Sequence, residues 1–142
     1  MKVLLIDDDA AVREALSETL ELTGFSVAAV AEWTAAKPLI AAGQAGIVVT
    51  DVRMPRDDGF AVLRGVHEMD KDIPVIMITG HADVAMGVRA MQQGAYDFIE
   101  KPIDPEYVIG LVGRASEHRS LVIEHRRLRT LIQSNALEGR IL

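Results

Sequence analysis

Five short aliphatic runs, separated by stretches with helical spacing, constrain the fold of this chain more than any other feature. The runs occupy residues 3–6, 26–30, 47–50, 75–79 and 96–99. Because apolar residues follow one another in these runs, we expect burial on both faces, as in a parallel sheet with helices on each side. The sequence therefore predicts an α/β fold, a doubly wound five-stranded parallel sheet of order 2-1-3-4-5 with five helices.

The segments between the runs carry signals for helix ends. Helices are expected between the strands, the second, third and fourth at residues 34–42, 59–68 and 83–93. Thr23-Gly24 is a stop signal for the first helix and Gly94 for the fourth, while Asp104 and Pro105 are typical of an N-cap and first helical position. Pro38 removes one hydrogen bond from the second helix, so we expect a kink or a late start there.

The fifth predicted helix continues past the end of a compact domain. Its extension carries Leu121, Leu128 and Leu131 on one side, with Arg126, Arg127 and Arg129 beyond them. This pattern fits either a solvated, salt-bridged helix or a short coiled coil between two chains, and two heptads do not decide between them. We predict a compact domain at 1–115, an extended helical linker at 116–133, and at 134–142 the start of a linker to a further domain.

Composition limits what the chain binds. With 142 residues, of which 49% are hydrophobic, the chain is expected to form one core. Its net charge of -6 opposes non-specific binding to nucleic acid or membranes, and without cysteine it has no disulfide or thiolate site. The first apolar run is too short for a signal sequence or a membrane span. We therefore expect a cytoplasmic protein without direct membrane or nucleic-acid contacts.

Polar side chains follow four of the five predicted strands. Asp7–Asp9 come after the first strand, Asp51 after the third, Thr79 ends the fourth and Lys101 follows the fifth. In a sheet of order 2-1-3-4-5 these strand ends meet at the switch point between the first and third strands, where ligands bind. Taken singly, each residue has an ordinary structural explanation, and Asp9 is expected only to cap a helix. Their joint placement favours one shared site.

The shared site predicts phosphoryl chemistry. Crowded carboxylates repel one another unless a cation compensates, and Mg²⁺ prefers such oxygen ligands together with water and phosphate oxygens. In this interpretation Asp51 is the nucleophile, Asp8 and Asp51 hold Mg²⁺, and Asp7 orients a metal-bound water. Lys101 and Thr79 each meet one phosphoryl oxygen, offsetting the negative charge of the transferred group.

These residues resemble the response-regulator receiver domains. The matching motifs are residues 4–9 (LLIDDD), 50–55 (TDVRMP) with 58–59 (DG), 78–80 (ITG) and 96–102 (YDFIEKP). The resemblance implies that a histidine kinase phosphorylates Asp51 with Mg²⁺, and that the domain catalyses only its own phosphorylation and dephosphorylation, without being an enzyme otherwise. It also implies that the backbone carbonyl of Arg53 completes the metal site and that the Lys101–Pro102 bond is cis.

A narrower resemblance is to the C4-dicarboxylate transport regulators, within the nitrogen-regulatory class of sigma54-dependent activators. It is carried by residues 78–83 (ITGHAD), 94–98 (GAYDF) and the tail 119–129. In that class a receiver is followed by a helical linker, an AAA+ ATPase and a helix-turn-helix. This chain contains no Gly-Lys-Ser/Thr phosphate-binding loop, so we do not expect it to hydrolyse ATP itself.

The resemblance also implies a switch. Phosphorylation of Asp51 draws the Thr79 hydroxyl inward, and the aromatic residue at Phe98 then turns inward in the vacated space. Phe98 lacks the hydroxyl of the tyrosine that many relatives carry, and a role as plain core remains open for it. The fourth helix, fifth strand and fifth helix form the expected dimer face, together with the helical tail. The dimer would control the downstream ATPase.

Two other functions fit parts of the sequence. A haloacid-dehalogenase-like phosphatase would use Asp7 as its nucleophile, but its further acidic pair would have to come from Asp97 and Glu100, whose spacing is unsuitable. That reading also leaves the motif around Asp51 without a purpose. A stand-alone receiver that acts by docking on a partner is the other alternative, against which the long tail argues.

Overall fold

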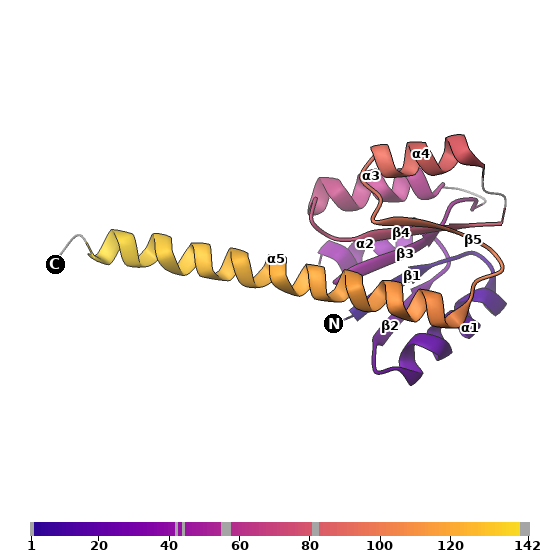
Figure 1. Ribbon diagram of the computed structural model, residues 1–142, viewed down its shortest axis with the longest axis horizontal. Helices are drawn as coiled ribbons and strands as arrows, with labels where there is room; N and C mark the ends of the chain where they lie inside the picture. Colours follow the sequence, from indigo (N-terminus) through magenta and orange to yellow (C-terminus); the bar gives the residue numbers. More distant parts are fainter. Residues whose placement is uncertain (1, 42, 44, 55–57, 81–82, 140–142) are drawn as a thin grey trace.

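A computed structural model of the chain describes residues 2–41, 43, 45–54, 58–80 and 83–139. Strands and helices alternate along the chain (Figure 1). The elements are β1 (Lys2–Ile6), α1 (Ala10–Leu22), β2 (Ser26–Val30), α2 (Trp33–Ala41), β3 (Ile47–Asp51), α3 (Gly59–Met69), β4 (Val75–Thr79), α4 (Val84–Gln92), β5 (Asp97–Glu100) and α5 (Pro105–Gly139). None of the helices in this described part is long and apolar enough to cross a membrane.

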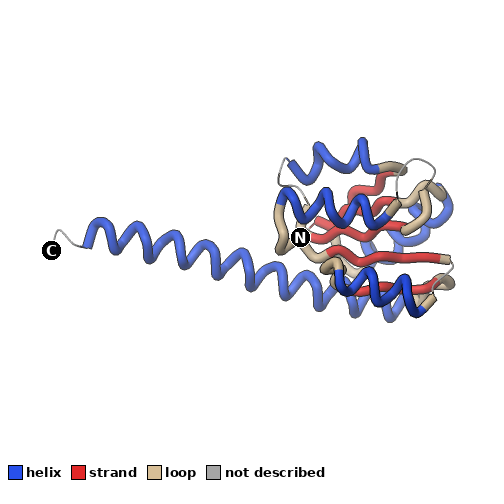
Figure 2. The backbone as a smooth tube through the Cα atoms, turned by 90° about the horizontal axis from the view of Figure 1, so that it is seen from above, coloured by secondary structure: helices blue, strands red, loops and turns tan. Residues whose placement is uncertain are grey.

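The five strands form one parallel sheet in the order β2-β1-β3-β4-β5, which confirms the predicted fold class. Figure 2 shows helices on both sides of this sheet. Alternate residues of a strand enter different cores: Leu4 and Ile6 pack with α2, α3 and α4, whereas Val3 and Leu5 pack with α1 and α5. Burial of both faces explains why the strands are apolar throughout rather than alternating.

The helices begin and end largely where the sequence predicts. Asp9 caps α1 by accepting the N–H groups of Ala11 and Val12, and Asp104 accepts the N–H of Glu106 at the start of α5. Gly24, which follows α1, has a φ of 100°, a conformation that glycine adopts without strain. The late start expected for α2 is not observed, because this helix begins at Trp33 and continues through Pro38.

Helix α5 is continuous and extends well beyond the sheet (Figure 1). Its first turns pack Val108, Leu111, Val112 and Ala115 into the core. One turn later the next buried residue of α5 is charged. Arg119 is only 8% exposed, and its Nη2 lies 2.8 Å from Asp70 Oδ2. The apolar contact of α5 with the domain is therefore continued by an ion pair.

A second arginine on the same side of α5 extends this ion pair into a network. Arg126 donates from Nη1 and Nη2 to the two carboxylate oxygens of Asp70, at 2.9 and 2.7 Å, and from Nη2 to Asp72 Oδ2 at 2.6 Å. Arg119 and Arg126 are two helical turns apart, so both face the loop between α3 and β4. We call these four side chains the tail clamp. The clamp fixes α5 against the domain as far as Arg126.

The tail clamp depends on the negative charge of Asp70. Hydrogen bonds from Arg126, then from the Asp72 backbone N–H and from Arg119, outweigh burial and hold the pKa of Asp70 well below its usual range. A carboxylate with a lowered folded-state pKa contributes stability above its unfolded pKa and loses it as the pH falls toward the folded value. Its contribution is therefore complete at neutral pH.

We predict that Asp70→Asn lowers the free energy of unfolding at pH 7 by about 1 kcal/mol. This is the contribution expected of a charged hydrogen-bond network, reduced because the network is partly exposed. The loss should persist down to about pH 5 and shrink below about pH 4, where the unfolded aspartate is protonated. Urea unfolding followed by circular dichroism measures it. The control is Glu124→Gln, which removes the exposed Glu124–Arg127 pair and should change little. Equal losses in the two variants would contradict the account.

Candidate functional site

The predicted site residues come together at the carboxyl edge of the sheet. Asp7 directly follows β1, Asp51 is the last residue of β3, Thr79 is the last of β4, and Lys101 directly follows β5. Strand pairing brings these ends to nearly the same level of the sheet. Asp51 is opposite Ile78, and Thr79, the residue after Ile78, is opposite Glu100. The edge lies at the switch point between β1 and β3.

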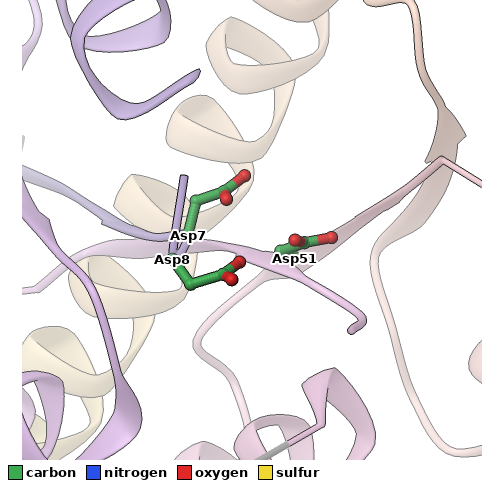
Figure 3. Close-up of side chains that lie close together, drawn as sticks. All are labelled: Asp7, Asp8 and Asp51. Carbon is green, nitrogen blue, oxygen red and sulfur yellow. The ribbon is translucent and has the colours of Figure 1, made fainter. Parts of the chain in front are cut away.

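Three carboxylates form the centre of this site (Figure 3). Asp7, Asp8 and Asp51 each offer one oxygen, and these oxygens lie within 4.8 Å of one another. Asp7 is 2% exposed and Asp51 8%, whereas Asp8 is exposed. The cluster thus has a buried side formed by two strand ends and an open side at Asp8.

Lys101 supplies a positive charge to the buried side of the cluster. Its Nζ lies 3.5 Å from Asp7 Oδ2 and 3.7 Å from Asp51 Oδ2. The Lys101–Pro102 peptide bond is cis, and the Lys101 N–H donates to the carbonyl oxygen of Thr79 at 2.8 Å. These contacts hold the lysine at the end of β4, beside the carboxylates.

One ammonium group does not balance the charge around Asp51. Burial, followed by the negative charge of Asp7, raises the pKa of Asp51 above its usual value, and Asp8 adds to the rise. Lys101 and the backbone N–H of Val52 oppose the rise without cancelling it. A further cation next to Asp51 would stabilise its ionised form.

The donor set suits Mg²⁺. All three groups are hard carboxylate oxygens, and the exposed position of Asp8 leaves room for the waters that Mg²⁺ retains when bound by few carboxylates. Arg53 lies two residues beyond Asp51 with its side chain exposed, and its backbone pairs with Asp58. Asp8 and Asp51 are the candidate ligands from side chains, and Arg53 can contribute its carbonyl oxygen.

Asp7 is held from two directions. Its Oδ1 accepts the N–H of Asp9 at 2.9 Å, and its carbonyl oxygen accepts a hydrogen bond from Arg13 Nη1 at 2.7 Å. The contact with Arg13 was not predicted, because a surface arginine one turn into α1 has no motif of its own. These bonds fix the buried carboxylate at the start of α1 and leave its Oδ2 facing Lys101.

A glycine allows α3 to begin directly against the phosphoacceptor candidate. A Cβ atom at Gly59 would lie 2.7 Å from the carbonyl oxygen of Asp51 and 2.9 Å from Val52 Cα, closer than side chains come. The Gly59 N–H donates to the Val52 carbonyl oxygen at 2.8 Å. The end of β3 is therefore braced by the first turn of α3. The sequence showed Gly59 only as part of a motif.

The two predicted switch residues lie on neighbouring strands. Thr79 is 1% exposed at the end of β4, and Phe98 is partly buried on β5, opposite Met77 of β4. Phe98 also lies beside Gly87 of α4, where an added Cβ would be 3.6 Å from its ring. Phe98 thus lies on the strand next to that of Thr79 and beside α4.

Other predicted features fall outside this site. Asp97 begins β5, at the opposite edge of the sheet, and accepts a hydrogen bond from the Tyr107 hydroxyl at 3.1 Å. Within the described residues, Asp97 and Glu100 do not join the carboxylate cluster, so the acidic pair needed by the phosphatase alternative is not assembled. Pro55, His81 and Ala82, which belong to the quoted motifs, lie outside the residues that the structure describes.

Comparison with known proteins gives a consistent assignment. The family described as "Response regulator receiver domain" matches residues 3–112. The chain is 46% identical over 142 residues to the C4-dicarboxylate transport transcriptional regulatory protein DctD of Pseudomonas aeruginosa, covering 99% of this chain and 31% of that protein. It is 47% identical over 137 residues to DctD of Rhizobium meliloti, covering 96% and 30%. The chain thus spans about a third of the length of these relatives.

Solved structures agree with the sequence relatives. The beryllofluoride-activated NtrC4 receiver domain dimer superposes with a TM-score of 0.79 at 33% identity, covering 83% of this chain and 98% of that one. The predicted resemblance, both to receiver domains and to the dicarboxylate transport regulators, is confirmed by these matches. The chain belongs to the response regulator receiver domain family.

Proposed function

We propose that this chain is a receiver that accepts a phosphoryl group on Asp51 from a sensor histidine kinase, in the presence of Mg²⁺, and transmits this state to a downstream module. The observation that carries the proposal is the convergence of Asp7, Asp8 and Asp51 with the Lys101 ammonium at one strand edge. Such an arrangement of carboxylates and one cation suits a site that binds a divalent ion and a phosphoryl group.

Transfer needs a nucleophile in line with the leaving group. A carboxylate oxygen of Asp51 attacks the phosphorus of a phosphohistidine, an O–P bond forms and the P–N bond breaks, leaving the electron pair on the imidazole nitrogen. Asp51 is the best-placed acceptor because Gly59 braces it and Lys101 engages one of its oxygens, whereas both oxygens of Asp7 are engaged, by the Asp9 N–H and by Lys101. With Mg²⁺ bound, Asp7 would orient a water at the metal rather than accept the phosphoryl group.

The proposed transfer requires positive charge beside the Asp51 carboxylate. The raised pKa of Asp51 means that its nucleophilic, ionised form gains from any added positive charge. Mg²⁺ bound by Asp8, Asp51 and the Arg53 carbonyl oxygen would supply it and neutralise phosphoryl oxygens. Lys101 stays within reach of both Asp7 and Asp51 and meets one further phosphoryl oxygen.

The switch follows from the packing of β4, β5 and α4. A phosphoryl group on Asp51 adds strong acceptor oxygens one strand away from Thr79, whose hydroxyl can donate to them. Movement of Thr79 changes the space available to Phe98, and the Phe98 ring lies beside Gly87 of α4, where an added Cβ would be 3.6 Å away. Since Phe98 has no hydroxyl, its two positions differ in packing alone. The α4-β5-α5 face changes as a result.

The output is proposed to be control of dimerisation. Val84, Val88 and Met91 of α4 and Tyr107 of α5 have large, exposed side chains. The tail of α5 exposes further leucines. Relatives such as DctD are about three times longer than this chain. We propose that the dimer, formed in the cytoplasm, controls a downstream AAA+ transcription-activator module for dicarboxylate transport genes.

We predict that wild-type protein incubated with acetyl phosphate and Mg²⁺ gains one phosphoryl group and that Asp51→Asn gains none. Phosphorylation of the Asp8→Asn variant should need at least about tenfold more Mg²⁺. Mutating residues that only hydrogen-bond to a metal ligand already weakens metal binding by about this factor, and Asp8 is itself a proposed ligand. Intact-protein mass spectrometry provides the measurement. Asp9→Asn is the matched control, since asparagine caps a helix as well as aspartate does. A labelled Asp51→Asn protein, or an equal Mg²⁺ requirement in the Asp8 and Asp9 variants, would refute the assignment.

We expect beryllofluoride with Mg²⁺ to change the association state of the full chain, measured by light scattering. A shorter chain ending at Arg126 keeps the tail clamp but loses the distal part of the exposed tail, so it should associate at least about tenfold more weakly. Undiminished association of the shorter chain would show that the tail is not a dimer element. No response of the full chain to beryllofluoride would argue against the switch.

A further inference from the structure

Beyond the domain, α5 carries a continuous stripe in which two histidines alternate with aliphatic residues. His118, Leu121, His125, Leu128 and Ile132 follow one another at intervals of three and four residues, the spacing that places side chains on one seam of a helix. Leu121 is 71% exposed, Leu128 45% and Ile132 65%, and both histidines are exposed. We call these five residues the histidine stripe. Its apolar members have no cover within the described chain.

Most of the histidine stripe lies beside the surface of α5 that contacts the domain, and only His118, at its start, faces a domain side chain, the ring of Tyr96. Arg119 and Arg126 of the tail clamp each follow a stripe histidine by one residue, which rotates them about 100° around the helix. The clamp therefore occupies one side of α5 and leaves the stripe open on the adjacent side. Because the clamp holds α5 in place, the stripe is presented at a fixed position relative to the domain.

A different seam would also contain two of these leucines, but it carries a cost. A seam formed by Leu121, Glu124, Leu128 and Leu131 would bury Glu124, whose carboxylate lies 2.7 Å from Arg127. Removing this ion pair from water is unfavourable. The histidine stripe instead buries His125, and a neutral imidazole is far less costly to bury than a carboxylate. The stripe with the histidines is therefore the better packing surface at neutral pH.

Charges beside the stripe favour a second copy of this chain in parallel orientation. Glu124 and Arg129 lie on opposite flanks of the stripe, five residues apart, which is the spacing of ion pairs across a parallel two-stranded coil. In a parallel pair each Glu124, which is already paired with Arg127 of its own helix, also lies beside Arg129 of the other copy. In an antiparallel pair Glu124 faces Glu124 and Arg129 faces Arg129, which is repulsive. The flanking charges thus select one orientation.

We propose that a second copy of this chain docks in parallel along the histidine stripe, so that His118 and His125 face their counterparts, and that protonation of these histidines opens the interface. The inference rests on the tail dimer of the proposed function and adds its seam, its orientation and its sensitivity to acid. Imidazole changes charge between about pH 5 and pH 8, whereas neighbouring carboxylates and arginines keep theirs.

The surroundings of the histidines do not offset added positive charge. The groove that contains His118 and His125 is also lined by Lys71, Asp72, Arg126 and Arg129. Its one acid, Asp72, is already paired with Arg126 at 2.6 Å. His118 also faces the ring of Tyr96, 6.2 Å away between centroids, and Glu124 next to His125 is paired with Arg127. Imidazolium groups in the seam would therefore repel each other and these cations.

Sedimentation equilibrium at about pH 8 and pH 5.5 tests the acid sensitivity. We use the full chain in whichever state, with or without beryllofluoride and Mg²⁺, associates at the higher pH. Dimerisation should weaken by about tenfold per pH unit for each proton that the dimer excludes, through the range where imidazole titrates. The double variant His118→Leu with His125→Leu should associate at both pH values alike. This variant keeps the other two histidines, His67 and His81, so any pH dependence that remains in it comes from groups outside the histidine stripe.

The outcomes separate this inference from the proposed function. Association at pH 8 that is insensitive to pH, or an equal loss in the double variant, would overturn the histidine stripe while leaving the dimer in place. Absence of association in both states and at both pH values would overturn the dimer as well.

Cross-linking tests the orientation, because the chain contains no cysteine. Single variants Leu121→Cys and Ile132→Cys should each form a disulfide-linked dimer under mild oxidation, since a parallel pair places every stripe residue beside its counterpart. An antiparallel pair can do so for only one of the two. Ile123→Cys is the control, being exposed on the opposite side of α5. Efficient cross-linking of Ile123→Cys, or of only one stripe position, would contradict parallel docking.

Discussion

The contact of one ammonium group with two buried carboxylates is the interaction on which the rest of this structure depends. Lys101 Nζ lies within 3.7 Å of both Asp7 and Asp51, and among the described residues it is the only cation paired with their carboxylates. Its charge lowers the pKa of Asp51 but does not cancel the effects of burial and of Asp7. The folded chain thus contains a strand edge that is stable enough to form and still short of positive charge. That shortage explains why the carboxylates suit a divalent cation such as Mg²⁺, whose charge could in turn balance a phosphoryl group in the proposed reaction.

The acidic strand edge and the tail clamp lie at opposite ends of the domain. Asp51, Thr79 and Lys101 lie at the carboxyl ends of the strands, whereas the tail clamp holds the loop that precedes β4. One continuous helix joins the two ends, because α5 begins just after Lys101–Pro102 and continues past Arg126 without a break. A change at the site can therefore reach the tail through β5 and α5, provided that the clamp holds.

Much of this arrangement could be predicted from the sequence, because it depends on local patterns. Continuous apolar runs indicated the buried parallel strands, and polar residues at strand ends identified the edge where Asp7, Asp8 and Asp51 converge. The tail clamp could not be predicted in the same way. Asp70 meets Arg119 and Arg126 across 49 and 56 residues, and the pattern around these arginines equally fits a solvated helix. Pairing between distant surface charges follows from the fold and not from any local spacing.

The central claim is that Asp51, and no other aspartate of the cluster, carries the phosphoryl group. Reduction of the acyl phosphate with borohydride after treatment with acetyl phosphate and Mg²⁺ converts the modified aspartate to homoserine, which peptide mass spectrometry locates directly. Our account predicts homoserine at position 51 alone, with unmodified Asp7 and Asp8 in the same digest. Homoserine at position 7 would contradict it and would support the phosphatase alternative instead.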